Sequence, residues 1–236
     1  MTNQNLNKAM TLTSLLLLVI LFQNFDYANL AVPMTPVDAQ VRVSHAKELL
    51  GKKYNGSFAH KAESIADLHV TIYQDVYKRL PKQYKSQAMD LTHTIITEAE
   101  AHDFDPVFVM AVIKTESSFN PKAKGSFGEI GLMQIKPDTA EWIAKKGKLA
   151  FHGKSTLENP IENVKIGVAY LNYLRGTFAG YANKYLSAYN MGAKNVRKLY
   201  GKSEKPKEYS LRVMKNYKDI YVRMIASRMT TIAEND

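Results

Sequence analysis

The chain has 236 residues, of which 45% are hydrophobic and 23% are charged. This composition excludes a largely disordered chain, and the length suits one compact domain with a smaller attachment. The formal net charge of +10 favours an anionic partner, such as nucleic acid, a membrane surface or an acidic polymer, or a solvated basic surface. The absence of cysteine excludes disulfides, thiolate metal sites and a cysteine nucleophile.

Residues 1–31 have the pattern of a secretory signal peptide. Lys8 precedes an apolar run over residues 10–22, and the small residues Ala28 and Ala31 follow. A short basic start, an apolar core of about 7–15 residues and a small-residue end are typical of such signals. The run is shorter than the roughly 20 residues that span a membrane, although an uncleaved anchor or a core helix has a similar pattern. The sequence therefore predicts export.

Residues 32–86 are predicted to form a linker, over residues 32–40, and then a basic, weakly helical region. Two prolines and the lack of periodicity indicate the linker. In the segment 46–54, Gly51 would end a helix, and a partner-binding arm is the alternative. An apolar stripe at helical spacing follows and ends at Pro81. This stripe consists of Ile65, His69, Ile72 and Val76.

From residue 87 to residue 236 the pattern is that of helices without strands. Asp105-Pro106 and Asn159-Pro160 each combine an N-cap residue with proline at the first helical position. Apolar residues repeat at intervals of three and four, as on the buried face of a helix. These stripes are Leu91, Ile95 and Ala99; Val109, Val112 and Ile113; Ile161, Val164, Val168 and Leu171; and Val213, Tyr217, Ile220 and Met224. The predicted fold class is all-α, with a small helical N-terminal extension.

The common metal, hydrolase and nucleotide motifs are missing from the sequence. The six histidines lack ligand spacing, so we predict neither a metal nor another cofactor. The Gly-x-Ser-x-Gly elbow of serine hydrolases does not occur. Gly153-Lys154-Ser155 resembles the end of a phosphate-binding loop, but Gly147 is one position too far upstream and no strand pattern precedes it. No nucleic-acid recognition motif accompanies the positive charge.

Glu116 is the strongest candidate for a catalytic group. It lies near the end of the helix that begins at Pro106, because Pro121 restricts Asn120 to an extended conformation. The negative end of the helix dipole and apolar neighbours such as Phe119 disfavour a carboxylate, so we expect a raised pKa for Glu116. A carboxyl that is protonated near neutral pH can give a proton to a leaving oxygen, as cleavage of a glycosidic bond requires.

A glycine-rich segment follows Glu116. Gly125, Gly128 and Gly131 do not fit one regular element and predict a loop whose backbone lies close to another group, such as a ligand. Gln134 can both donate and accept hydrogen bonds, which suits sugar hydroxyls and N-acetyl groups. By residue type alone, the structural positions here are Leu132, Met133 and Ile135.

Three motifs occur in order from Glu116 onward. They are residues 116–121 (ESSFNP), residues 128–135 (GEIGLMQI) with a PxTA sequence over residues 137–140, and residues 188–192 (AYNMG). Together they resemble the soluble lytic transglycosylase (SLT) domain family. The resemblance implies a lysozyme-like domain of the goose-type or SLT kind over residues 87–236, and an enzyme that cuts the glycan strands of peptidoglycan.

The resemblance also implies a mechanism with Glu116 as the single acid/base. Glu116 would protonate the oxygen between N-acetylmuramic acid and N-acetylglucosamine. As a carboxylate it would then accept the proton of the muramoyl 6-hydroxyl, which closes a 1,6-anhydro ring. The substrate-binding positions that the resemblance implies are Gln134, Met133, Tyr189, Asn190 and Ser126.

Two of these positions have specific expectations. Tyr189 should hydrogen-bond near Glu116. The alternative is a role in the core, because Tyr181, Tyr185 and Tyr189 share a helical face on which two of the three would be core residues. Members of the family often carry serine nine residues after the glutamate, where this chain has glycine. Ser126, one residue later, is the candidate for the missing hydroxyl, and a backbone group in its place is the alternative.

Two alternatives to a lytic transglycosylase stay open at this point. Hydrolysis by a lysozyme-type muramidase uses two carboxylates, and the candidate partners are Glu129, Asp138 and Glu141. Of these, Glu129 lies in the glycine-rich segment, whereas the other two follow Pro137 and fit a helix start. The second alternative is a catalytically inactive wall-binding protein, against which the presence of Glu116 argues.

Location and partners follow from these predictions. An exported chain of this kind belongs in the periplasm or cell envelope, with peptidoglycan glycan strands as its partner. We expect a monomer that does not bind nucleic acid. Contact with the envelope membrane or with a secretion apparatus stays open, and residues 41–85 are the segment without an assigned role.

Overall fold

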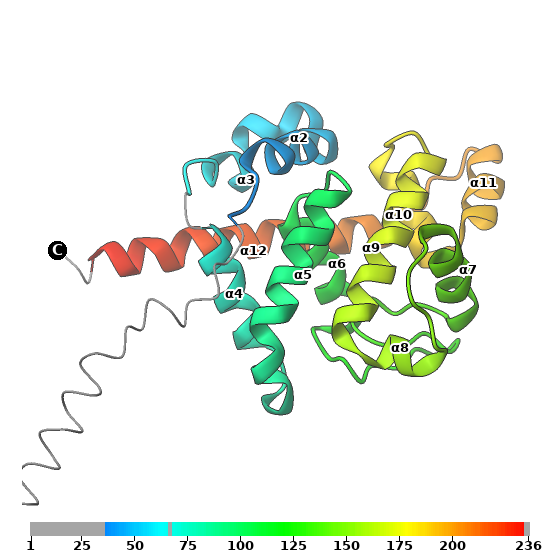
Figure 1. Ribbon diagram of the computed structural model, residues 1–236. Helices are drawn as coiled ribbons and strands as arrows, with labels where there is room; N and C mark the ends of the chain where they lie inside the picture. Colours follow the sequence, from blue (N-terminus) through cyan, green and yellow to red (C-terminus); the bar gives the residue numbers. More distant parts are fainter. Residues whose placement is uncertain (1–35, 66–67, 234–236) are drawn as a thin grey trace, which may run out of the picture. The chain divides into compact units, whose positions relative to one another are not determined.

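The computed structural model describes residues 36–65 and 68–233, and every regular element within them is a helix (Figure 1). The elements are α2 (Ala39–Leu50), η2 (Gly51–Gly56), α3 (Phe58–Lys61), α4 (Leu68–Arg79), η3 (Lys82–Gln87), α5 (Ala88–Ala101), α6 (Pro106–Ser117), α7 (Pro137–Gly147), α8 (Lys154–Glu158), α9 (Pro160–Thr177), α10 (Ala182–Met191), α11 (Ala193–Gly201) and α12 (Glu208–Ala233). The all-α prediction is confirmed. Over these ranges no helix combines the length and apolar character of a membrane span. The predicted signal segment, residues 1–31, lies outside them.

The first described helix, α2, has a defined start and end. Asp38 caps it by accepting hydrogen bonds from the main-chain nitrogens of Gln40 at 2.8 Å and Val41 at 3.0 Å. Gly51 ends it with a φ of 52°, a conformation that glycine adopts without strain. The predicted helix end at Gly51 is therefore confirmed. The predicted linker over residues 32–40 ends earlier than expected, because Asp38 already initiates the helix.

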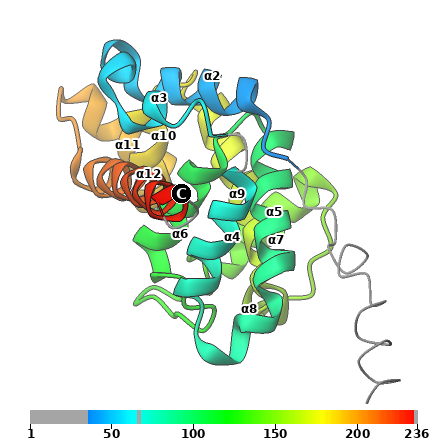
Figure 2. The same ribbon diagram turned by 90° about the vertical axis from the view of Figure 1, so that its left-hand side faces the viewer.

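Residues before 87 share the hydrophobic core of the residues that follow. Ile72 and Val76 of α4 are fully buried, and α4 packs beside α5 (Figure 2). Ile65, the first residue of the predicted stripe, is buried but precedes the described part of α4. The core runs without interruption from α2 to α12.

The two Asx-Pro helix starts are confirmed. Asp105 caps α6 by accepting a hydrogen bond from the Val107 nitrogen at 2.8 Å. Asn159 caps α9 by accepting from the nitrogens of Ile161 at 2.9 Å and Glu162 at 3.2 Å. In both helices proline follows the cap, where its missing N–H costs no hydrogen bond.

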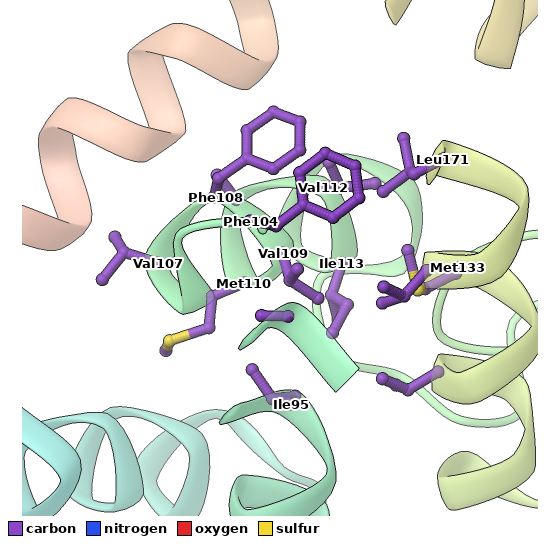
Figure 3. Close-up of a cluster of buried hydrophobic side chains, with 14 of the residues drawn as sticks. Ile95, Phe104, Val107, Phe108, Val109, Met110, Val112, Ile113, Met133 and Leu171 are labelled. Atoms are coloured by element: carbon purple, nitrogen blue, oxygen red, sulfur yellow. The ribbon is translucent and has the colours of Figure 1, made fainter. Parts of the chain in front are cut away.

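Helix α6 lies in the middle of the core. Its residues from Pro106 to Ile113 are all buried, and α5 and α12 pack against it. Figure 3 shows its apolar side chains with Ile95 of α5, Leu171 of α9 and Met133 around them. Because buried neighbours fix this helix, they also fix the position of its last turn.

A buried polar cluster joins α2, α6 and α12. The Asp105 carboxylate accepts hydrogen bonds from the hydroxyls of Tyr217 at 2.6 Å and Tyr221 at 2.7 Å. Arg42 donates to Tyr221 at 3.4 Å, and the ring of His45 accepts from the Asp105 main-chain nitrogen at 3.0 Å. Burial raises the pKa of Asp105, whereas the tyrosines and Arg42 lower it. These bonds supply the partners that a buried carboxyl needs.

Candidate active site

A pocket with a volume of about 660 Å³ lies beside the C-terminal end of α6. Its wall is formed by the last turn of α6, by the glycine loop (residues 122–136), and by residues of α7, α9, α10 and α11. The lining residues that bear on function are Glu116, Ser126, Phe127, Glu129, Gln134, Thr139, Tyr170, Tyr189 and Asn190. Four of the five predicted substrate-binding residues therefore gather around the predicted catalytic glutamate.

Glu116 is held in a form that can donate a proton. Burial, the largest cause, and the negative charge of Glu129 raise its pKa to about 7. The hydroxyl of Tyr209 and the charge of Arg212 act in the opposite direction. The raised pKa that the sequence predicted is confirmed. Phe119, the expected apolar neighbour, is fully buried, and its ring lies 5.6 Å from the guanidinium carbon of Arg79.

Tyr209 is the hydrogen-bond partner of Glu116, a contact that was not predicted from the sequence. Its hydroxyl donates to Oε1 of Glu116 from the first turn of α12. Burial raises the pKa of Tyr209 well above its ordinary value, so it remains a donor at all relevant pH values. A signal was present in the sequence, since Tyr209 lies four residues before Val213 and extends the apolar stripe of α12 by one turn.

Tyr189 lines the same pocket as Glu116 and forms its hydrogen bond close by. Its hydroxyl donates to the main-chain carbonyl of Met133 at 2.8 Å and not to Glu116. Its ring stacks on that of Tyr209, with centroids 6.5 Å apart and planes 19° apart, and lies 5.3 Å from the ring of Tyr170. Tyr189 therefore ties α10 to the glycine loop and forms part of an aromatic wall.

The side chain of Met133 belongs to the core and not to the pocket, so its predicted role in substrate binding is wrong. It is fully buried among the apolar side chains drawn in Figure 3. A Cβ on Gly167 of α9 would lie 2.4 Å from its sulfur. The second motif contributes a packing residue here because the loop turns this side chain inward. Of the three tyrosines on α10 and its cap, Tyr185 is also fully buried, whereas Tyr181 is 63% exposed.

The glycine loop approaches the protein's own side chains, not only the pocket. A Cβ on Gly131, whose φ is 83°, would lie 2.3 Å from Nδ2 of Asn163. This buried asparagine accepts a hydrogen bond from the Met133 nitrogen at 2.8 Å. It donates to the carbonyls of Ile130 and Leu157, each at 2.9 Å. The close contact that the glycines predicted is thus an internal anchor, which the sequence did not reveal.

Gln134 and Ser126 line the pocket in different ways. The amide nitrogen of Gln134 donates to the carbonyls of Ala123 at 3.1 Å and Gly131 at 2.8 Å, which uses both of its donors. The side-chain oxygen of Gln134 remains available to accept a hydrogen bond from a ligand. Ser126 is exposed in the lining, and within the described residues no hydrogen bond joins it to Glu116.

Glu129 places a second carboxylate in the pocket. Its Oε2 accepts from the Phe127 nitrogen at 3.0 Å, and its Oε1 lies 3.5 Å from Nζ of Lys136. A Cβ on Gly125 would lie 2.3 Å from Oε2, so the carboxylate occupies the space of a side chain at residue 125. Burial acts to raise the pKa of Glu129, but backbone N–H groups and Lys136 lower it overall. Glu129 is therefore ionised near neutral pH, where its charge helps to keep Glu116 protonated.

The pocket thus combines one carboxyl that keeps its proton with one carboxylate that does not. Environments that separate two pKa values in this way assign an acid role to one group and an electrostatic role to the other. Both roles fit a reaction in which an acid protonates the leaving group and a positive charge develops on the substrate.

Comparison with known proteins agrees with this chemistry. The model of the Transglycosylase SLT domain family matches residues 93–211, a range that includes Glu116, the glycine loop, Tyr189 and Tyr209. Membrane-bound lytic murein transglycosylase C of Edwardsiella ictaluri is 32% identical over 142 residues, which are 56% of this chain and 39% of that protein. The soluble lytic murein transglycosylase of Salmonella typhimurium is 36% identical over 102 residues, 43% of this chain and 16% of that protein. The chain therefore matches less than half the length of either relative.

The fold is shared with a solved structure. The 70 kDa soluble lytic transglycosylase of Escherichia coli aligns with 78% of this chain and 33% of its own, at 22% identity and a TM-score of 0.52. The predicted SLT-type, lysozyme-like helical fold is confirmed.

Proposed function

The chain belongs to the Transglycosylase SLT domain family, and from that premise we propose that it is a peptidoglycan lytic transglycosylase. It would cleave the β-1,4 bond between N-acetylmuramic acid and N-acetylglucosamine and leave 1,6-anhydromuramic acid ends. The observation that carries the proposal is Glu116, a pocket carboxyl whose pKa is raised to about 7. Such a group is part protonated and part ionised at neutral pH, so it can serve as acid and then as base.

In the first step the proton of Glu116 goes to the glycosidic oxygen, and the bond from that oxygen to muramoyl C1 breaks. The positive charge that develops at C1 is favoured by the ionised Glu129 in the same pocket. In the second step the muramoyl 6-hydroxyl gives its proton to Glu116, and a bond forms between O6 and C1. The proton returns to its starting place and no water is consumed.

Tyr209 supports the second half of this cycle. A carboxylate is costly where Glu116 lies, because burial removes water from it. The Tyr209 hydroxyl donates to Oε1, and the charge of Arg212 is close enough to lower the pKa of Glu116. Both interactions favour the ionised glutamate that must accept the 6-hydroxyl proton.

A hydrolytic muramidase is the second candidate, because Glu129 supplies the second carboxylate that such a mechanism uses. The surroundings of Glu129 argue against it. Both of its oxygens are engaged within the protein, one by the Phe127 nitrogen at 3.0 Å and the other by Lys136 at 3.5 Å, so the carboxylate is less free to attack the sugar or to activate water. The other candidates lie outside the lining: Asp138 in the first turn of α7, and Glu141 beside Lys145 at 4.0 Å.

Product analysis tests the proposal. Purified peptidoglycan is digested with the parent chain, with Glu116→Gln, and with Glu141→Gln as a matched exposed control. Mass spectrometry should find 1,6-anhydromuramic ends for the parent and for Glu141→Gln, and no products for Glu116→Gln. Reducing muramic acid ends would instead support the hydrolase, and full cleavage by Glu116→Gln would contradict any catalytic role for this residue.

We also propose that the protein acts as a monomer in the periplasm or cell envelope. The signal-like segment over residues 1–31 and the net charge of +10 support this location, since wall and envelope lipids are anionic. Fractionation of cells that produce the full chain tests it. Recovery of the protein in the cytoplasm alone would contradict the proposal.

A further inference from the structure

An aromatic pair lies on the protein surface close to the pocket. Trp142 of α7 and Tyr173 of α9 meet edge to face, with ring centroids 4.6 Å apart and planes 88° apart. Trp142 is 45% exposed, although it is the largest apolar side chain available to a core. It is also the only tryptophan among the 236 residues. Neither ring belongs to the pocket lining described above.

Helix geometry makes this pair a continuation of the pocket wall. Thr139 of α7 and Tyr170 of α9 line the pocket, and the two helices pack against each other. Trp142 and Tyr173 each lie three residues further along the same helix. Residues at this spacing share a helical face and are separated by about 4.5 Å along the axis. Since Thr139 and Tyr170 line one pocket and Trp142 contacts Tyr173, both helices extend the wall toward the aromatic pair.

The chemistry of the pair suits a sugar ring. The face of an aromatic ring carries partial negative charge and attracts the polarised C–H groups on the face of a pyranose. Lys146 of α7 lies 5.7 Å from the centroid of the Tyr173 ring, which adds a cation at the edge of the pair. A half-exposed indole with a neighbouring cation matches a polar glycan strand better than it matches an apolar peptide.

We propose that Trp142 and Tyr173 form an additional glycan subsite, which binds the β-1,4-linked N-acetylhexosamine strand where it leaves the pocket. This inference rests on the proposed function, because the strand that reaches the pair is the one bound beside Glu116. Continuity with the pocket selects this occupant over a partner protein.

The single tryptophan gives a direct test. Full-length Glu116→Gln protein, which should bind without cleaving, is titrated with the β-1,4-linked hexamer of N-acetylglucosamine while the fluorescence of Trp142 is followed. Calorimetry with the same hexamer then compares Trp142→Ala, Trp142→Phe and Tyr181→Ala in the Glu116→Gln background. Tyr181 is a matched control, since it is an exposed aromatic residue outside the pocket lining.

The hexamer should change the fluorescence of Trp142 in a saturable way. Trp142→Ala should weaken binding by about 2- to 10-fold, the usual size of one aromatic stacking contact, while Trp142→Phe largely restores it and Tyr181→Ala has no effect. Unchanged fluorescence together with unchanged affinity of Trp142→Ala would overturn the subsite and leave the proposed function intact, provided that the parent still releases anhydro products. Absence of both hexamer binding and wall cleavage would overturn both.

Discussion

Replacing Glu116 with glutamine should stabilise the protein at neutral and alkaline pH as well as abolish cleavage. The pKa of Glu116 is about 7 in the folded chain, against an ordinary value of 4.5. Between these two values the folded chain keeps a proton that the unfolded chain has released. The free energy of unfolding therefore falls as the pH rises through this window. Below pH 4.5 the carboxyl is protonated in both the folded and the unfolded chain. Above about pH 7 it is ionised in both, and the folded chain then carries the full free-energy cost of the buried charge.

The magnitude follows from the same two values. A pKa of about 7 against an ordinary 4.5 corresponds, at about 1.4 kcal/mol for each tenfold change in acidity, to roughly 3 kcal/mol. Water at the pocket mouth screens part of the charge, so a gain of about 2 to 3 kcal/mol is expected. Glutamine has the same shape and can still accept the hydrogen bond of Tyr209, but it carries no charge.

Urea unfolding of the parent and of Glu116→Gln at about pH 4, 6 and 8 measures this difference. The two chains should be equally stable at the lowest pH, and the variant should gain steadily as the pH rises. Glu141→Gln, an exposed glutamate on α7, should show no such trend. A stability difference for Glu116→Gln that is the same at every pH would refute the reasoning, because it would mean that Glu116 is not a buried acid with a raised pKa.

Three further predictions concern the surroundings of this residue. Tyr209→Phe removes the hydroxyl that lowers the pKa of Glu116, so the alkaline limb of the pH–rate profile should move to higher pH. Glu129→Gln removes the charge that raises this pKa, so the same limb should move to lower pH, and the products should keep their anhydro ends. Asp105→Ala should cost about 3–5 kcal/mol in urea unfolding because it leaves buried partners unpaired, whereas Asp38→Ala, which removes only an exposed helix cap, should cost about 1 kcal/mol.

The sequence predicts the features of this protein that depend on neighbouring residues. Helix starts such as those at Asp105 and Asn159 are local, because the cap and the groups it binds lie within three residues of each other. The position of residues 116–135 beside the pocket is predictable for the same reason. Local signals do not give the direction of each side chain in an irregular loop, which is why Met133 was expected in the pocket and lies in the core.

Contacts between distant residues were the part that the sequence could not supply. Tyr209 is 93 positions from Glu116, and only the packing of α12 on α6 brings them together. Asn163 reaches the glycine loop across 30 positions in the same way. The family resemblance placed Tyr189 near Glu116, and both residues line the pocket. The rotation that directs the Tyr189 hydroxyl to the loop carbonyl depends on the tertiary structure.

The packing of α12 on α6 connects the site to the far end of the fold. Asp105 and Glu116 stand at opposite ends of α6, and α12 bonds to the first through Tyr221 and Tyr217 and to the second through Tyr209. At about 1.5 Å per residue, the two carboxyls are about 16 Å apart along α6, and Tyr209 and Tyr221 are about 18 Å apart along α12. The helices therefore run antiparallel in one register that satisfies both ends, and a slip of one residue would break both sets of bonds. Because Arg42 of α2 completes the Asp105 cluster, a helix outside the pocket supports the register in which Tyr209 meets the Glu116 carboxyl.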